Sequence, residues 1–205
     1  MKTLQNAALL SVTNKSRIVD IATAISATGR PLVSTGGTAE TLRTAGLDVI
    51  DVSDITNFPS IMDGRLKTLN SKVFGGILYD RNKEQHVIDA EQVEIDYGFD
   101  IVVVNLYDFE GNPSIEQIDI GGPSLIRAGS KNWRHVTVLT DPAQYDVVIQ
   151  ELQQSDNTDE DTRHYLARDA FAATAKYDTM ISKWFANEVT SHRVYMRTGV
   201  TESGK

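Results

Sequence analysis

Short apolar runs recur along the first 140 residues, and each is bounded by glycine or by polar residues. The run that begins at Ile101 reads Ile-Val-Val-Val without a polar interruption. A continuous run of this kind is typical of a strand that is buried on both faces of a parallel sheet. We predict strands at Ala7–Val12, Pro31–Ser34, Val49–Val52, Val73–Leu78, Ile101–Leu106 and Val136–Thr140.

Helical spacing appears between these runs. Ser16–Ala27 carries apolar residues three and four positions apart, and Thr38–Thr44 is a second, shorter segment of the same kind. We expect the second helix to end at Ala45-Gly46, because the glycine can adopt the left-handed conformation of a helix C-cap. Strands that alternate with helices predict βαβ units and a layered α/β fold with a parallel sheet.

The pattern changes after Asp141. Pro142–Gln154 and Asp161–Val189 have the periodicity of helices and few strand signals. We therefore predict an α/β core over residues 1–141 and a helical extension over residues 142–205. The extension is expected to pack on the core or on a partner subunit.

Composition narrows the class of protein. Hydrophobic residues make up 40% and charged residues 23% of the 205 positions, as in a globular domain. The absence of cysteine excludes disulfides, thiolate zinc sites and a cysteine nucleophile, and a cytoplasmic enzyme is the expectation. A net charge of −8 argues against broad nucleic-acid binding, but a local group of Lys and Arg could still bind a small anion.

Two strand ends have the composition of a phosphate cradle. Ser34–Ala39 reads Ser-Thr-Gly-Gly-Thr-Ala, which lets backbone N–H groups at a helix start approach an anion. The structural alternative is a tight turn with Thr38 as the helix N-cap. Ser11–Ser16 adds hydroxyls and the Lys15 ammonium, and its alternative is a capped helix start with a solvated lysine. Both segments are expected at the same edge of the sheet, where ligands of parallel sheets bind.

A third basic segment is Asp63–Thr68, in which Arg65 and Lys67 alternate. In an extended loop the two cations point the same way, and the arginine offers a bidentate fork to an anion. Two solvated loop charges are the alternative interpretation.

Groups that can move protons follow the buried Ile101 run. Tyr107 supplies a phenol, Asp119 a carboxylate and Lys131 an amine, and Gly121 begins a probable helix before a proline. Taken singly, Tyr107 is better explained as a strand-end aromatic that packs against Phe109, and Asp119 is compatible with a helix N-cap.

Together these segments carry a family resemblance. The chain resembles the IMP cyclohydrolase domain of the bifunctional purine-biosynthesis enzyme, which has a methylglyoxal-synthase-like three-layer fold. The matching segments run from Leu9 to about Asp178, and the transformylase half of the enzyme is not matched, so a stand-alone cyclohydrolase-like chain is expected. The segments are LLSVTNK, STGGTAETL, ITNFPSIMDGRLKTL, SKVFGGIL, VVVNLYDFE, IDIGGPSLIRAGSKN and AFAATAKYD.

The resemblance implies ring closure of 5-formamidoimidazole-4-carboxamide ribonucleotide (FAICAR) to inosine monophosphate, with loss of water. It implies no metal, no organic cofactor and a homodimer. The net charge argues against a nucleic-acid partner, and the absence of an apolar run near the ~20 residues of a membrane span argues against a membrane partner. The family's substrate-binding positions fall on Thr13, Asn14, Lys15, Thr35, Gly36, Gly37, Thr38, Arg65, Thr68, Asn105, Ile120 and Gly121. Its catalytic positions fall on Lys67, Tyr107, Asp119 and Lys131.

The roles expected for these residues follow from the reaction. Backbone N–H groups near Lys67 and Gly121, with the Lys67 ammonium close by, would stabilise the oxyanion of the tetrahedral adduct. Tyr107 and Lys131 would form the proton-transfer pair, with the pKa of the phenol lowered by the ammonium. Asp119 would accept a hydrogen bond from the substrate carboxamide.

The chain departs from the family pattern at several positions, and three of these departures replace a histidine. Asn70, Phe74 and Trp133 stand where the family usually has histidine, and we expect Phe74 and Trp133 to reshape a pocket wall. This favours a paralogue that closes a related ring on a different ribonucleotide as a competing interpretation. A nucleotide-sensing regulatory domain of the same fold is a second competing interpretation, and methylglyoxal synthase itself, which shares the phosphate cradle, is a third.

Overall fold

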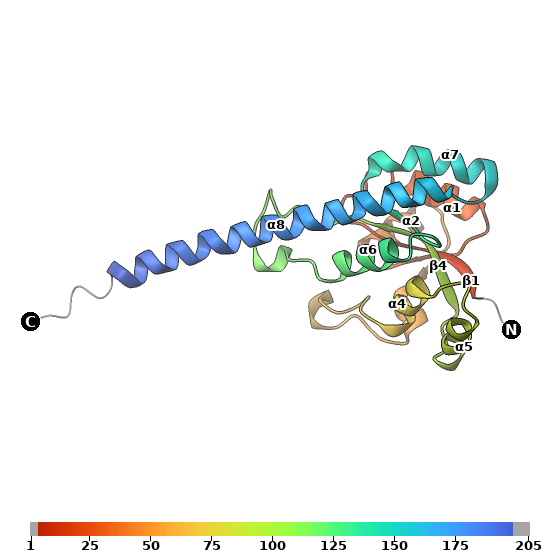
Figure 1. The fold of residues 1–205 in the computed structure, drawn as a ribbon, viewed down its shortest axis with the longest axis horizontal. Helices are drawn as coiled ribbons and strands as arrows, with labels where there is room; N and C mark the ends of the chain where they lie inside the picture. The colour runs from red at the N-terminus through yellow and green to blue at the C-terminus, as the bar shows by residue number, and fades with distance from the viewer. Residues whose placement is uncertain (1–3, 199–205) are drawn as a thin grey trace, which may run out of the picture.

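A five-stranded parallel sheet lies at the centre of the protein, with helices on both faces (Figure 1). The computed structural model describes residues 4–198, with side-chain environments as far as Asn187. The strand order is β3-β2-β1-β4-β5. The strands are β1 (Gln5–Ser11), β2 (Leu32–Ser34), β3 (Val49–Asp51), β4 (Tyr97–Val104) and β5 (Thr137–Leu139).

The connections between the strands are helical, as a parallel sheet requires. The short 3₁₀ helices are η1 (Met62–Gly64), η2 (Ile115–Gln117) and η3 (Pro142–Gln144). The α-helices are α1 (Ile18–Ala27), α2 (Gly36–Thr44), α3 (Val52–Thr56), α4 (Ser71–Leu78), α5 (Glu84–Gln92), α6 (Gly121–Lys131), α7 (Tyr145–Ser155) and α8 (Glu160–Thr198). The α/β class is therefore confirmed.

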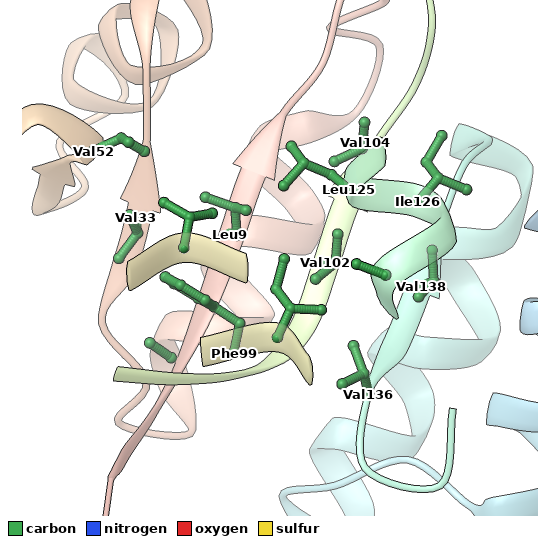
Figure 2. Packing of buried hydrophobic residues seen from close by; sticks show 14 of the residues in the cluster. Leu9, Val33, Val52, Phe99, Val102, Val104, Leu125, Ile126, Val136 and Val138 are labelled. Atoms are coloured by element: carbon green, nitrogen blue, oxygen red, sulfur yellow. The ribbon is translucent and has the colours of Figure 1, made fainter. Parts of the chain in front are cut away.

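Alternate residues of the strands belong to two hydrophobic clusters, one on each face of the sheet. On one face the strands pack against α4 and α6, as Figure 2 shows for Leu9, Val102 and Leu125. On the other face Leu10 and Val103 belong to a cluster that also contains residues of α1 and α7. The central strands β1 and β4 are thus buried on both sides, as their continuous apolar runs predict.

The strand predicted at Val73–Leu78 is wrong, because this segment is the helix α4. The side chain of Asn70 accepts a hydrogen bond from the backbone N–H of Lys72 and caps the helix. A Cβ on Gly76 would lie 2.4 Å from the carbonyl oxygen of Tyr97, so the glycine lets α4 lie directly on β4. Periodicity alone does not separate a short apolar strand from a short buried helix.

The segment after residue 141 contributes to the same body. α7 packs against α1, and Tyr145 and Val148 are fully buried in the second cluster. α8 packs along α6 and β5 and then projects beyond the sheet (Figure 1). The division at residues 141 and 142 stays a prediction, and residues 199–205 lie outside the described part of the chain. Among residues 4–198 no helix is both long and apolar enough to cross a membrane.

An ion pair is buried near the start of β4. Arg30 and Asp100 each keep only 9% of their side-chain surface exposed, and Arg30 Nη2 lies 2.9 Å from Asp100 Oδ2. Arg30 Nη1 also donates to the hydroxyl of Thr28 and to the carbonyl of Asp156. The pair ties the start of β4 to the turn that precedes α8.

Candidate functional site

A pocket of about 550 Å³ opens where β1, β2 and β4 end. This is the edge of a parallel sheet at which ligands bind, and the volume suits a small organic molecule. The lining comes from the loop after β1, the start of α2, the loop 63–69, the ends of β4 and η2, and the start of α6. Its charged members are Lys15, Asp63, Arg65, Lys67, Glu116 and Asp119.

One end of the pocket is positively charged. α2 begins at Gly36, whose φ of +55° favours glycine, and Thr35 is its N-cap. A Cβ on Gly37 would lie 3.7 Å from Lys15 Nζ, and one on Gly36 would lie 3.9 Å from Lys67 Nζ. Two ammonium groups therefore flank the N-terminus of a nine-residue helix, which is the arrangement that binds an anion.

Thr38 is not the helix N-cap. Its hydroxyl accepts from the backbone N–H of Val12 at 3.1 Å and donates to the Val12 carbonyl at 3.0 Å. The side chain is 4% exposed and also borders the pocket. Thr38 thus joins α2 to the loop after β1, and the two halves of the cradle are held at a fixed separation.

Asn105 holds the loop that carries Lys15. Its Oδ1 accepts from the N–H of Thr13 at 2.7 Å and of Asn14 at 3.0 Å, and its Nδ2 donates to the Asn14 carbonyl. Asn105 and Thr13 line the pocket, whereas the Asn14 side chain accepts from the N–H of Ser16. The amide of Asn105 is therefore already committed to the loop.

Asp119 lies at the start of α6. Its Oδ1 accepts from the N–H of Gly122 at 2.9 Å, so it caps the helix although Ile120 is the formal N-cap residue. Burial raises the pKa of the Asp119 carboxyl, and the Gly122 N–H and the nearby Lys67 ammonium oppose that shift. A Cβ on Gly122 would lie 2.3 Å from Asp119 Oδ2, so only glycine leaves room for the carboxylate.

The Gly122 bond changes one expected role. The amide of Gly122, at the start of α6, is occupied by Asp119 and is not free to bind a substrate oxyanion. The Lys67 ammonium lines the pocket and is the charged donor available to an oxyanion.

The phenol of Tyr107 lines the pocket with 38% of the residue exposed. Its pKa is raised, first because the group is partly desolvated and second because the Asp119 carboxylate is near. The expected lowering of this pKa by Lys131 is therefore wrong. Tyr107 stays protonated at neutral pH and is equipped to donate a proton.

Lys131 does not reach the pocket. It is the last residue of α6, whereas Gly121 at the other end of the helix lines the pocket. Ten residues of helix separate their backbones by ~15 Å. The prediction that Lys131 and Tyr107 form a pair is wrong within one chain, because residues that are close in sequence lie at opposite ends of a helix.

Arg65 and Lys67 both line the pocket, as their alternation predicts, but Arg65 has a partner that the sequence did not indicate. Its guanidinium forms an ion pair with Glu116 of η2, and both side chains are exposed. Thr68 is 4% exposed and faces Gly121, where a Cβ would approach its hydroxyl to 2.9 Å. Ile120 is 59% exposed at the pocket margin.

The three residues that stand in place of family histidines lie outside the pocket lining. Asn70 caps α4, and Phe74 packs against the core cluster beneath it. Trp133 contacts His164 with ring centroids 4.8 Å apart, beyond the far end of α6. The expectation that Phe74 and Trp133 reshape a pocket wall is therefore wrong.

The residues described by the structure contain no group of three or more His, Asp or Glu side chains placed to hold a metal ion. The site consists of an anion cradle, a partly buried carboxylate and a protonated phenol.

This fold and site define a class of α/β domain. The family described as "MGS-like domain" matches residues 17–124, and the family described as "AICARFT/IMPCHase bienzyme" matches residues 129–203. The crystal structure of ForH has a TM-score of 0.80 and 31% sequence identity, covering 89% of this chain and 97% of that chain.

Curated relatives are more similar in sequence. The bifunctional purine biosynthesis protein PurH of Thermoanaerobacter sp. (strain X514) is 48% identical over 183 residues, which is 85% of this chain. PurH of Rhizobium johnstonii is 48% identical over 200 residues, or 91% of this chain. The chain belongs to the PurH family. It spans 36% and 37% of the length of these two relatives.

Proposed function

We propose that this chain is an IMP cyclohydrolase, an enzyme that closes the ring of FAICAR to give inosine monophosphate and water. The observation that carries the proposal is the joint lining of one pocket by Lys15, Lys67, Tyr107 and Asp119. One end of the pocket attracts an anion and the other can donate and accept protons. The matched relatives support the proposal, since they are named as purine biosynthesis proteins.

The substrate phosphate would occupy the positive end. The N–H groups at the start of α2 and the Lys15 ammonium supply donors and charge, and Thr13 and Thr35 supply hydroxyls. Charge-assisted bonds of this kind are about twice as strong as neutral ones. With the phosphate held there, the imidazole and its two substituents would extend toward Asp119.

Ring closure needs little covalent help, because nucleophile and electrophile sit on neighbouring ring atoms of the substrate. The carboxamide nitrogen attacks the formyl carbon and loses one proton, and the former formyl oxygen becomes an oxyanion and then a hydroxyl. The carbon–hydroxyl bond breaks, the formamido nitrogen gives up its proton, and water leaves. Orientation of reacting groups can lower an activation barrier by ~7–11 kcal/mol, and holding both groups in the reactive conformer can supply much of this amount.

The pocket residues match these needs. The Asp119 carboxylate accepts a hydrogen bond from the carboxamide N–H and makes its nitrogen a better nucleophile. The Lys67 ammonium stabilises the oxyanion, a contribution typically of ~3–4 kcal/mol. Tyr107 is protonated because its pKa is raised, so it donates a proton to the departing hydroxyl.

The test is an ultraviolet absorbance assay of ring closure with purified protein and FAICAR. Turnover by the wild type is expected, with kcat reduced at least ~100-fold in Asp119→Asn and Tyr107→Phe. Asp54→Asn and Tyr165→Phe make the same chemical changes at residues outside the pocket and should leave turnover within twofold. Tight nucleotide binding with no turnover in the wild type would refute the proposal and favour a different ribonucleotide substrate or a regulatory role.

A homodimer and a cytoplasmic location are part of the proposal. The second half of α8 carries Phe185, which is 44% exposed, and a second copy would cover an apolar side chain of this kind. Light scattering after size-exclusion chromatography measures the state directly, and a mass of 22.6 kDa at working concentrations would refute the dimer.

A further inference from the structure

The hydroxyl of Tyr177, a residue of α8, is bonded to the segment that carries Asp119. It accepts from the backbone N–H of Asp119 at 2.9 Å and donates to the backbone carbonyl of Gln117. Tyr177 is 3% exposed, and it lies 58 residues along the chain from Asp119. Both bonds hold backbone that leads directly into the pocket.

The ring of Tyr177 contacts the segment that carries Tyr107. It meets the Phe109 ring edge to face, with centroids 6.1 Å apart, and Phe109 is also in contact with Trp184 at 5.8 Å. Phe109 is 2% exposed, and its N–H donates to the carbonyl of Tyr107 at 2.9 Å. One side chain of α8 is thus in contact with both segments that bring proton-handling groups to the pocket.

We infer that Tyr177 is a positioning residue for the ring-closing reaction, fixing Asp119 through its hydroxyl and the Tyr107 segment through its ring. The inference rests on the proposed function. Tyr177 is not part of the pocket lining, and its hydroxyl is engaged by two backbone groups. It therefore acts through the residues that it holds.

The positioning matters because the carboxylate of Asp119 has little freedom. It bonds the N–H of Gly122, and its Oδ2 occupies space that a Cβ on Gly122 would fill. Removing the hydroxyl of Tyr177 would leave the Asp119 N–H and the Gln117 carbonyl without this hydrogen-bond partner. Because unsatisfied polar groups cost free energy, we expect this backbone to shift toward other hydrogen-bond partners. The carboxylate would move with its backbone, whereas the anion cradle on β1 and α2 would not.

Tyr177→Phe removes the hydroxyl and keeps the ring. We expect kcat to fall about tenfold, while the Kd for inosine monophosphate stays within twofold because the cradle is untouched. We also expect the acidic limb of the kcat/KM profile to move to higher pH, since a displaced carboxylate loses the hydrogen bond that opposes its raised pKa. Tyr145→Phe is the matched control, because Tyr145 is a buried tyrosine in the cluster on the other face of the sheet.

A second measurement does not depend on activity. Hydrogen exchange of the Asp119 amide reports its bond to Tyr177, so the amide should be protected in the wild type and lose protection in Tyr177→Phe. An unprotected Asp119 amide in the wild type would overturn the inference even if the variant did not fold.

The outcomes separate the inference from the proposed function. An active wild type with a Tyr177→Phe variant of unchanged kcat and pH profile would overturn the positioning role alone. Equal losses of kcat in Tyr177→Phe and Tyr145→Phe would also overturn it, since they would indicate a general loss of stability. A wild type without ring-closing activity, whose protected Asp119 amide is released in Tyr177→Phe, would overturn the proposed function and support the hold of Tyr177 on Asp119.

Discussion

Replacing Gly122 by alanine adds one methyl group at the most crowded point of the site. The new Cβ would lie 2.3 Å from Asp119 Oδ2 and 2.8 Å from Leu106 Cδ2, both closer than atoms approach without a shift. The backbone of Gly122 is helical, so alanine is not strained by φ. The carboxylate of Asp119 is the part that moves, and its bond to the Gly122 N–H breaks.

The magnitude follows from three opposing effects. Alanine in place of glycine within a helix stabilises by ~1 kcal/mol. Overpacking costs ~1–3 kcal/mol, and the lost bond to a charged acceptor costs ~1.5–3 kcal/mol. A net loss of about 3 kcal/mol is expected, which lowers Tm by about 6–12 °C in a chain of this size. Gly121→Ala is the matched control, because its Cβ would lie 2.9 Å from the Thr68 hydroxyl but 4.0 Å from Asp119 Oδ1, an ordinary contact, and we expect a loss below ~1 kcal/mol.

Urea denaturation and the ring-closure assay measure the two consequences. If Gly122→Ala acts by displacing the Asp119 carboxylate, kcat falls about 100-fold in Gly122→Ala. The double variant that also carries Asp119→Asn should then have nearly the same kcat as the less active of the two single variants, because changes that act through one group are not additive. A Gly122→Ala protein with the stability and kcat of the wild type would refute this reasoning, and so would fully additive losses in the double variant.

Three further outcomes are expected. Because burial raises the pKa of Asp119, the acidic limb of the kcat/KM profile should lie above pH 3.8. Lys67→Gln removes a charge that opposes this shift and should move the acidic limb to higher pH; an acidic limb that does not move contradicts the assignment of this limb to Asp119. Lys15→Ala should raise the KM about tenfold with kcat within threefold and should weaken the salt dependence of binding, as titration at 50–300 mM salt would measure. Arg30→Met should lower the free energy of unfolding by ~3–5 kcal/mol in urea, because it leaves the Asp100 carboxylate buried and unpaired, and adding Asp100→Asn should restore part of that loss.

Local chemistry explains which parts of the site could be predicted. The glycines and hydroxyls after β2 and the lysine after β1 follow strand ends, and parallel strands bring those ends to one edge. The predicted cradle residues Lys15 and Gly37 therefore lie together. The Val73–Leu78 prediction failed because a six-residue apolar segment satisfies a strand and a buried helix equally.

Longer-range contacts explain the parts that could not be predicted. Lys131 is twelve residues from Asp119, and its distance from the pocket depends on whether those residues form a loop or a helix. The helix places it at the opposite end. Glu116 faces Arg65 across a separation of 51 residues, and no local pattern marks such a pair.

The sequence by itself determined the α/β class, the family, the two strand ends that form the anion cradle and the choice of Tyr107 and Asp119 as residues of the same pocket. Those features depend on the order of residues over a few positions, because strand and helix preferences and turn geometry are local. Only the tertiary structure showed that the Asp119 carboxylate fills the space beside Gly122 and that the pKa of Tyr107 is raised. Only the tertiary structure showed that Tyr177 contacts the segments of Asp119 and Phe109. Burial and hydrogen bonds between residues far apart in the chain exist only after the helices have packed on the sheet.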